Sequence, residues 1–211
     1  MEKIGGAKGV EGLLFYWILW VGWIIITFFY PKNHPDRLNY AAWLLISILL
    51  STTSVPLGLF EITGTGFFMM VTSYIYFSRL KKKKRLYFLL STFILMLVTV
   101  CFLLYELFDP VWLFMKREWL LAIILTCVTL LLLHDQKQRM IAIILGFIHG
   151  EIFYSLILAE YSFTYPVATL YSLDSFALTL SLLFGWNLFE QMASYFDKQF
   201  HSEEKEKQKL S

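Results

Sequence analysis

The stretch 86–108, LYFLLSTFILMLVTVCFLLYELF, holds 23 residues, of which only Glu106 is charged. The hydrocarbon core of a bilayer is about 30 Å thick, so a helix that crosses it needs about 20 mostly apolar residues. Six basic residues crowd into positions 79–85 just before this stretch, and Asp109-Pro110 follows it. The pattern predicts a membrane-spanning helix between two well-marked ends.

Similar apolar stretches recur along the whole chain. Of its 211 residues 58% are hydrophobic and 16% charged, and the mean hydropathy is +0.61, values that exclude an ordinary soluble domain. The sequence therefore predicts an all-α polytopic membrane protein with about seven transmembrane helices. The expected spans are 12–30, 38–60, 62–78, 86–108, 112–133, 140–160 and 167–190.

The connections between these spans are short, and prolines and polar residues mark several of them. We expect one transmembrane bundle over 1–196 and a charged cytoplasmic tail over 197–211, either a solvated helical extension or disordered. To be long enough, the fifth span must include Lys116 and Arg117 near its start. We expect these two side chains to reach toward lipid headgroups.

The distribution of Lys and Arg predicts the orientation, because cytoplasmic loops retain an excess of positive charge. If the basic loop 79–85 lies inside, fourteen of the 18 basic residues lie on the inner side and four on the outer side. This places the N-terminus outside and the C-terminus in the cytoplasm, which requires an odd number of spans. Seven spans satisfy that condition.

Signatures of catalysis and of cofactor binding are missing from the sequence. Cys101 and Cys127 each lie inside an apolar stretch, so neither a disulfide framework nor a zinc-binding spacing is available. We find no phosphate-binding glycine loop, no zinc-type histidine pair and no nucleophile elbow. We therefore expect no enzyme, no cofactor, no metal and no nucleic-acid partner.

Small residues at four-residue spacing predict helix packing, because helices in lipid associate through close contact. We expect the sixth and seventh spans to pack on each other through two such seams, Ala142, Gly146, Gly150 and Ala177, Ser181, Gly185. The second span carries a further seam near Pro56, which predicts helix packing around a proline bend. Its members are Ser47, Ser51, Ser54 and Gly58.

Ionisable residues at membrane depth are the candidates for chemistry, because each is costly there unless paired or hydrated. His149, Glu151 and Asp174 form the candidate polar site, although His149 and Glu151 project to opposite sides of their helix. One hypothesis is a proton or cation site made by Glu151 and Asp174 behind an acidic mouth. The mouth would comprise Glu61, Glu106 and Glu160. The alternative is that these acids cap helix ends or bond neighbouring helices.

The basic loop has two interpretations. It fixes the topology, and a cationic cluster beside a membrane helix attracts anionic lipid headgroups at the cytoplasmic face. The candidate lipid contacts are Arg79, Lys81, Lys82, Lys83, Lys84 and Arg85.

The apolar opening EGLLFYW over 11–17, the compact multi-span plan and the basic third loop resemble the YphA-like family of small bacterial multi-pass membrane proteins. That family has no established activity, so the resemblance implies a bacterial plasma membrane location and transfers no site residue.

Three functions remain open at this point. We expect a structural or interaction role in the membrane, with lipid and a second membrane protein as partners. The second hypothesis is a small transporter or channel component that uses Glu151 and Asp174. The third, an enzyme acting on lipid or membrane peptides, requires His149, Glu151 and Asp174 to converge at one depth.

Overall fold

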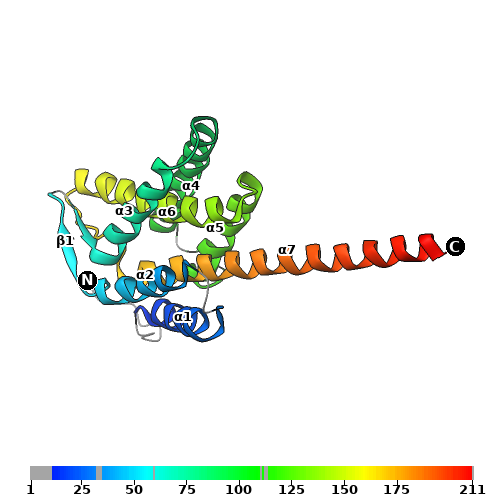
Figure 1. Cartoon of the computed structure of the whole chain (residues 1–211). Coiled ribbons are helices and arrows are strands. Elements are labelled where there is room, and N and C mark those ends of the chain that lie inside the picture. The colour runs from blue at the N-terminus through cyan, green and yellow to red at the C-terminus, as the bar shows by residue number, and fades with distance from the viewer. Residues whose placement is uncertain (1–10, 32–34, 59, 110, 112–113, 211) are drawn as a thin grey trace.

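A computed structural model describes residues 11–31, 35–58, 60–109, 111 and 114–210, and these residues fold into a helical bundle (Figure 1). The expected helical architecture is confirmed, apart from one two-stranded hairpin. The two strands, β1 (Ser54–Pro56) and β2 (Glu61–Thr63), form a small hairpin. The helices are α1 (Leu13–Ile24) with its π-helical continuation η1 (Ile25–Phe29), α2 (Arg37–Leu50), α3 (Gly64–Ser78), α4 (Lys82–Phe108), α5 (Arg117–Leu132), α6 (Gln136–Glu160) and α7 (Leu170–Leu210).

Successive helices contact one another in the order α1, α2, α3, α6, α4, α5 and α7, and α7 in turn contacts α1. α6 contacts four other helices, since it touches α5 and α7 as well as its two neighbours in this order. It contributes much of the buried core, with Ile143, Phe147 and Ile148 each at most 2% exposed. α6 therefore has more helix neighbours than any other helix of the described bundle.

The most extensive helix contact joins α4 to α6. A Cβ atom added at Gly146 would lie 2.5 Å from the Cβ of Leu95, and one at Gly150 would lie 2.5 Å from the Cβ of Thr99. The predicted seam on α6 therefore exists, but its partner is α4. The predicted pairing with Ala177, Ser181 and Gly185 is wrong, because α7 packs mainly on α5 and α1, and a Cβ at Gly185 would meet no atom within 4 Å.

The second predicted span, 38–60, is wrong at its C-terminal end, because α2 stops at Leu50 and the chain turns into the β1–β2 hairpin. β-Branched Thr52, Thr53 and Val55 favour extended backbone, and Pro56 has no backbone N–H to donate in a helix. Gly58 lies in the turn with φ of 77°, a conformation that favours glycine. Ser54 and Gly58 therefore belong to the hairpin and not to a helical seam.

The hairpin is joined to the α6–α7 connection. The amide of Thr63 donates to the carbonyl of Val167 at 3.1 Å, and the amide of Val167 donates to the carbonyl of Glu61 at 2.7 Å. Ile62 and Val167 form a parallel bridge, and both are fully buried. The backbone amides of Thr63 and Val167 are thus paired within the protein, as a membrane environment requires.

Three helical segments are long and apolar enough to cross a membrane, namely Lys84–Phe108, Gln136–Glu160 and Leu170–Asp197. Leu13–Phe29 and Arg37–Leu50 are apolar but shorter, while α3 and α5 have 15 and 16 residues. α4 and α6 begin four residues earlier than predicted, at Lys82 and Gln136, and α5 begins at Arg117. The count of seven spans stays a prediction at this stage.

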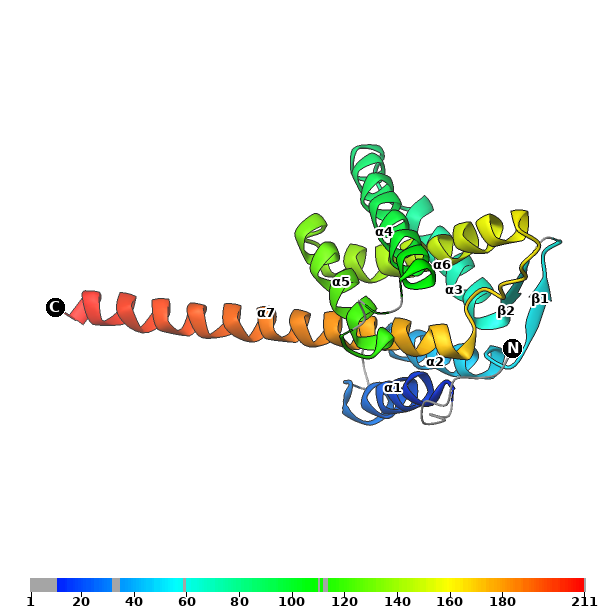
Figure 2. The same cartoon turned by 180° about the vertical axis from the view of Figure 1, so that it is seen from behind.

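α7 extends well beyond the bundle as one continuous helix (Figure 2). Its 41 residues correspond to a length of about 60 Å, twice the thickness of a hydrocarbon core. The tail predicted over 197–211 is therefore a helical extension as far as Leu210, and Ser211 lies outside the described residues.

The α4–α6 contact predicts that Gly146→Leu destabilises the protein. The new side chain must displace Leu95, and such overpacking costs about 1–3 kcal/mol. Gly185→Leu is the matched control, because it adds the same side chain to an open position. Thermal unfolding in mild detergent should show a lower midpoint for the first variant alone, and equal midpoints for the two variants would contradict the contact.

Candidate functional site

Glu151 is a fully buried carboxylate on α6, and its hydrogen bonds hold the connection between α6 and α7. It accepts from the amide of Ala168 at 2.8 Å, from the hydroxyl of Ser172 and from the phenol of Tyr165 at 3.4 Å. Ala168 has φ of 55°, which is unfavourable for a residue with a Cβ. Glu151 thus stabilises a strained turn in the connection.

Tyr165 lies on this connection, outside the helices, and its phenol O–H donates to Glu151. Burial, and next the nearby negative charge of Glu151, raise the pKa of the Tyr165 phenol above its ordinary value. Tyr165 also packs edge-on against the ring of Tyr154, with ring centroids 4.9 Å apart. Its proton is therefore retained at neutral pH.

Asp174, on α7, caps the N-terminus of α1. Its two carboxylate oxygens accept from the amide of Gly12 at 2.9 Å and from the amide of Phe15 at 2.8 Å. Gly12 is the N-cap residue of α1, has φ of 84° and has no side chain of its own to bond these amides. A negative charge here is also favoured by the positive end of the α1 dipole.

His149 faces away from Glu151, toward α3. Its Nδ1 lies 2.7 Å from the carbonyl oxygen of Leu145, which only accepts, so Nδ1 carries the proton. In the neutral ring Nε2 is then an acceptor, and the hydroxyl of Tyr74 donates to it at 2.6 Å. The predicted divergence of His149 and Glu151 is confirmed.

The proposed joint site of His149, Glu151 and Asp174 is therefore wrong. Ser172, which bonds Glu151, and Asp174, which bonds α1, are two residues apart and project to nearly opposite sides of α7. Each of the three predicted site residues has partners of its own, on different elements. Their convergence, on which the transporter and enzyme hypotheses depended, does not occur.

The predicted acidic mouth does not form one site either. Glu106 pairs with Arg117, whose Nε lies 2.8 Å from the Glu106 Oε2, whereas Glu61 lies in β2 and Glu160 is the last residue of α6. The Arg117 side chain is 10% exposed, and its guanidinium carbon lies 4.7 Å from the ring centre of Tyr171. The expectation that Arg117 reaches toward headgroups is wrong, because a carboxylate and an aromatic face inside the bundle bind it.

Beside this ion pair lies a pocket of about 280 Å³ between α4, α5, α6 and the α6–α7 connection. Its polar wall consists of Glu106, Arg117, Tyr154 and Tyr165, and Leu103 and Leu107 line the rest. The sequence singled out Glu106 and Arg117 separately but not as a pair, and it gave no signal for Tyr154 or Tyr165.

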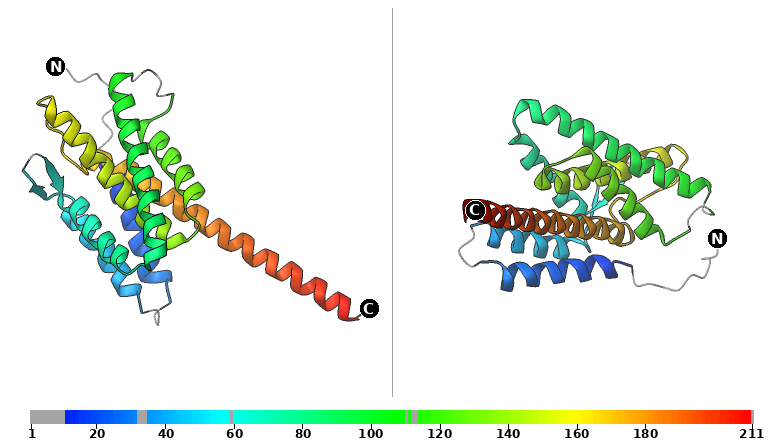
Figure 3. Two further views of the ribbon diagram at one scale, coloured as in Figure 1. Left: turned by 90° about the horizontal axis from the view of Figure 1, so that it is seen from above. Right: turned by 90° about the vertical axis from the view of Figure 1, so that its right-hand side faces the viewer.

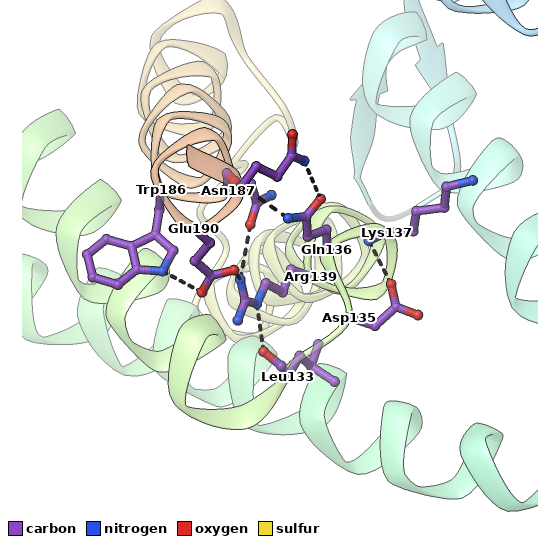
Figure 4. A network of polar contacts seen from close by, with 9 residues as sticks. Leu133, Asp135, Gln136, Lys137, Arg139, Trp186, Asn187 and Glu190 are labelled. Atoms are coloured by element: carbon purple, nitrogen blue, oxygen red, sulfur yellow. Dashed lines mark hydrogen bonds and ion pairs between the residues drawn. The ribbon is translucent and has the colours of Figure 1, made fainter. Parts of the chain in front are cut away.

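A second polar network lies where the turn between α5 and α6 meets α7 (Figure 4). Arg139 is 3% exposed, and it donates to the carbonyl of Leu133 at 2.7 Å, to Asn187 at 3.0 Å and to Glu190 at 2.8 Å. Trp186 donates to the other oxygen of Glu190 at 2.8 Å. In the sequence Arg139 is one of the fourteen basic residues assigned to the inner side, whereas in the structure it fixes the position of α7.

The basic loop contains both free and engaged cations. Arg79, Lys81, Lys82 and Lys84 are exposed, and Lys82 to Arg85 already belong to the first turn of α4. Arg85 donates to the carbonyls of Ser78 and Leu80 at 2.9 and 3.0 Å, so it closes the turn that follows α3. The side chain of Lys83 lies outside the described residues.

Metal binding finds no support in the part of the chain that the structure describes, where no group of three or more His, Cys, Asp or Glu side chains is placed to hold an ion. Cys101 and Cys127 are free and exposed on the surface of the bundle.

Three helices long and apolar enough to cross a membrane, together with the many large apolar side chains exposed on the bundle surface, define an integral membrane protein of the helical-bundle class. The family model for YphA-like integral membrane protein matches residues 11–209, so the chain belongs to this family and the resemblance seen in the sequence is confirmed. One relative is the Uncharacterized protein YphA of Bacillus subtilis (strain 168), 25% identical over 186 residues that cover 88% of this chain and 92% of the relative. No solved structure matches the chain.

The cap on α1 predicts that Asp174→Ala destabilises the protein and frays the start of α1. Two amides lose their acceptor, which costs about 1–3 kcal/mol. The measurements are unfolding in mild detergent and hydrogen exchange of the amides of Gly12 and Phe15. Glu160→Ala, at an exposed helix end, is the control. Exchange at Gly12 and Phe15 that is as slow in Asp174→Ala as in the control would contradict the cap.

Proposed function

We propose that this chain is a seven-span protein of the bacterial plasma membrane, with its N-terminus outside and its C-terminus in the cytoplasm, and that it has a structural or interaction role and no catalytic one. The membrane location rests on the family and the apolar helices. The number of spans, the sidedness and the role are proposals, and each has separate support.

The grouping of polar contacts supports seven alternating crossings. One group joins the start of α1, the β1–β2 hairpin, the α4–α5 connection and the α6–α7 connection. The second group lies at the α1–α2, α3–α4 and α5–α6 turns and at the middle of α7. The two groups occupy opposite ends of the bundle (Figure 3), as expected if every helix crosses once.

The short helices are compatible with crossing. α3 and α5 are about 23 Å long, and a short span is accommodated by local thinning of the bilayer and by flanking segments. β2 extends α3 at the end where the hairpin lies, and α5 is covered by α4, α6 and α7. Other elements of the bundle therefore pack against both short helices.

The observation that carries the interaction role is the projection of α7 beyond the bundle. Arg139 fixes α7 at Asn187 and Glu190, and the helix then continues for twenty residues to Leu210. Met192, Tyr195 and Phe196 are 59%, 60% and 51% exposed on this part. A rigid helix with exposed apolar side chains next to the cytoplasmic face is suited to bind a second membrane-associated protein.

A small transporter or channel component is the less favoured alternative. It was based on a site that Glu151 and Asp174 share, and both carboxylates are instead occupied by hydrogen bonds within the bundle. We therefore favour the interaction role.

The topology predicts which positions are accessible from each side. Single cysteines replace exposed residues at Leu57, Lys82, His134 and Phe163 in a variant without the two natural cysteines. A membrane-impermeant maleimide should label positions 57 and 163 in intact cells, and positions 82 and 134 only after permeabilisation. Labelling of 82 and 134 in intact cells would reverse the sidedness, and labelling of 57 and 82 from the same side would remove α3 as a span.

The interaction role predicts that a photo-crosslinking amino acid at Met192 or Tyr195 forms a discrete protein adduct in cells. The same amino acid at Leu49, which is 74% exposed on the lipid-facing side of α2, is the control and should capture lipid only. A chain truncated after Glu190 should lose copurification of the same partner in mild detergent. Adducts that are absent at both α7 positions would refute the role.

A further inference from the structure

An open apolar groove of about 190 Å³ lies on the surface formed by α3, α4 and α6. Its wall consists mainly of Phe77 from α3 and Phe88, Leu89, Phe93 and Met96 from α4. The groove does not belong to either polar network described above. It faces the surroundings of the bundle, where a membrane protein meets lipid chains.

The groove runs from one end of the bundle to about its middle. Phe77 is one residue from the end of α3 and Phe88 is six residues after the start of α4, so both lie near the α3–α4 turn. Met96 and His149, at the other end of the groove, lie near the centres of α4 and α6. The groove thus runs from the α3–α4 end of the bundle toward its middle, as one acyl chain does when its headgroup lies at the membrane surface.

The polar groups along the groove already have partners inside the protein. The hydroxyl of Tyr74 donates to His149, and the hydroxyl of Thr92 donates to the carbonyl of Phe88 at 2.9 Å. A ligand with a polar group at this depth would have to break one of these bonds. The groove is therefore suited to an apolar chain.

Positive charge is concentrated at the mouth of the groove. Arg79, Lys81, Lys82 and Lys84 are exposed, and the two ion pairs found among the described residues involve other cations. The guanidinium carbon of Arg85 lies 5.5 Å from the ring centre of Phe77, which lines the groove, so the α3–α4 turn that carries the cationic cluster borders the groove.

The start of α4 at this mouth also favours an anion. The N-cap residue of α4, Lys81, provides no side-chain cap, and the positive end of the α4 dipole attracts negative charge.

We propose that this surface binds one anionic glycerophospholipid, with its phosphate at the cluster of Arg79, Lys81, Lys82 and Lys84 and one acyl chain in the groove. Lipid chains gain no hydrophobic energy by leaving other lipid, so the cationic mouth supplies the selectivity and the groove supplies the position. The site depends only on the membrane location. The leaflet in which the lipid lies follows from the proposed orientation.

Native mass spectrometry of the purified full-length chain in detergent tests the site, with dioleoylphosphatidylglycerol as the probe and dioleoylphosphatidylcholine as the reference. We expect one tightly retained phosphatidylglycerol and no comparable phosphatidylcholine. Replacing Arg79, Lys81, Lys82 and Lys84 together with glutamine should weaken retention by more than about tenfold. The matched control replaces Lys198, Lys205, Lys207 and Lys209, which removes the same charge from the tail. Equal loss in the two quadruple variants would overturn the site, because charge alone would then be responsible.

The groove is tested separately. Leu89→Trp fills it, whereas Leu90→Trp adds the same ring at an equally exposed position, 54% in both cases, that does not line the groove. Only the first change should reduce retention, and both proteins should unfold at the wild-type temperature. Unchanged binding in Leu89→Trp, or full displacement by glycerol phosphate, would overturn the proposal, since either result means that the headgroup binds without a seated chain.

Discussion

Hydrocarbon offers no hydrogen-bond partner, so each polar group at membrane depth must find one within the chain. Glu151 and Asp174 meet this requirement with donors outside their own helices. Glu151 accepts a hydrogen bond from the amide of Ala168. The carbonyl of Ala168 in turn accepts from the hydroxyl of Thr63 in the hairpin at 2.8 Å. Asp174 holds the start of α1. Two carboxylates therefore connect α1, the hairpin, α6 and α7 at one end of the bundle.

The helices were largely predictable because the apolar runs are local. The stretch predicted at 86–108 is α4 from Lys82 to Phe108, and only its start differs. The hairpin was not predictable in the same way. The hydropathy of the apolar segment that contains β1 is compatible with a transmembrane helix. Its extended conformation depends on the pairing of β1 with β2 and of β2 with Val167. Hydropathy measures the preference for lipid and does not measure backbone conformation.

The contact partners of the polar and small residues could not be predicted from the sequence. Gly146 indicates that something approaches closely, but its neighbour is Leu95, which has no small-residue signature. Asp174 was recognised as a buried acid, yet its partners are backbone amides, which nearly every residue carries. Arg117 and Arg139 were read as interfacial charges, although both side chains are at least nine-tenths buried, because Glu106 and Glu190 lie across from them on other helices.

The continuity of α7 has a mechanical consequence. The helix is attached to α1 by Asp174 near one end, is clamped by Arg139 at Glu190, and has no break between these points or beyond them. An α-helix without a kink behaves as a stiff rod, and the portion beyond Glu190 is about 30 Å long. A tilt of about 10° at the clamp therefore swings the far tip by about 5 Å. The arm works as a lever that magnifies small rearrangements of the bundle.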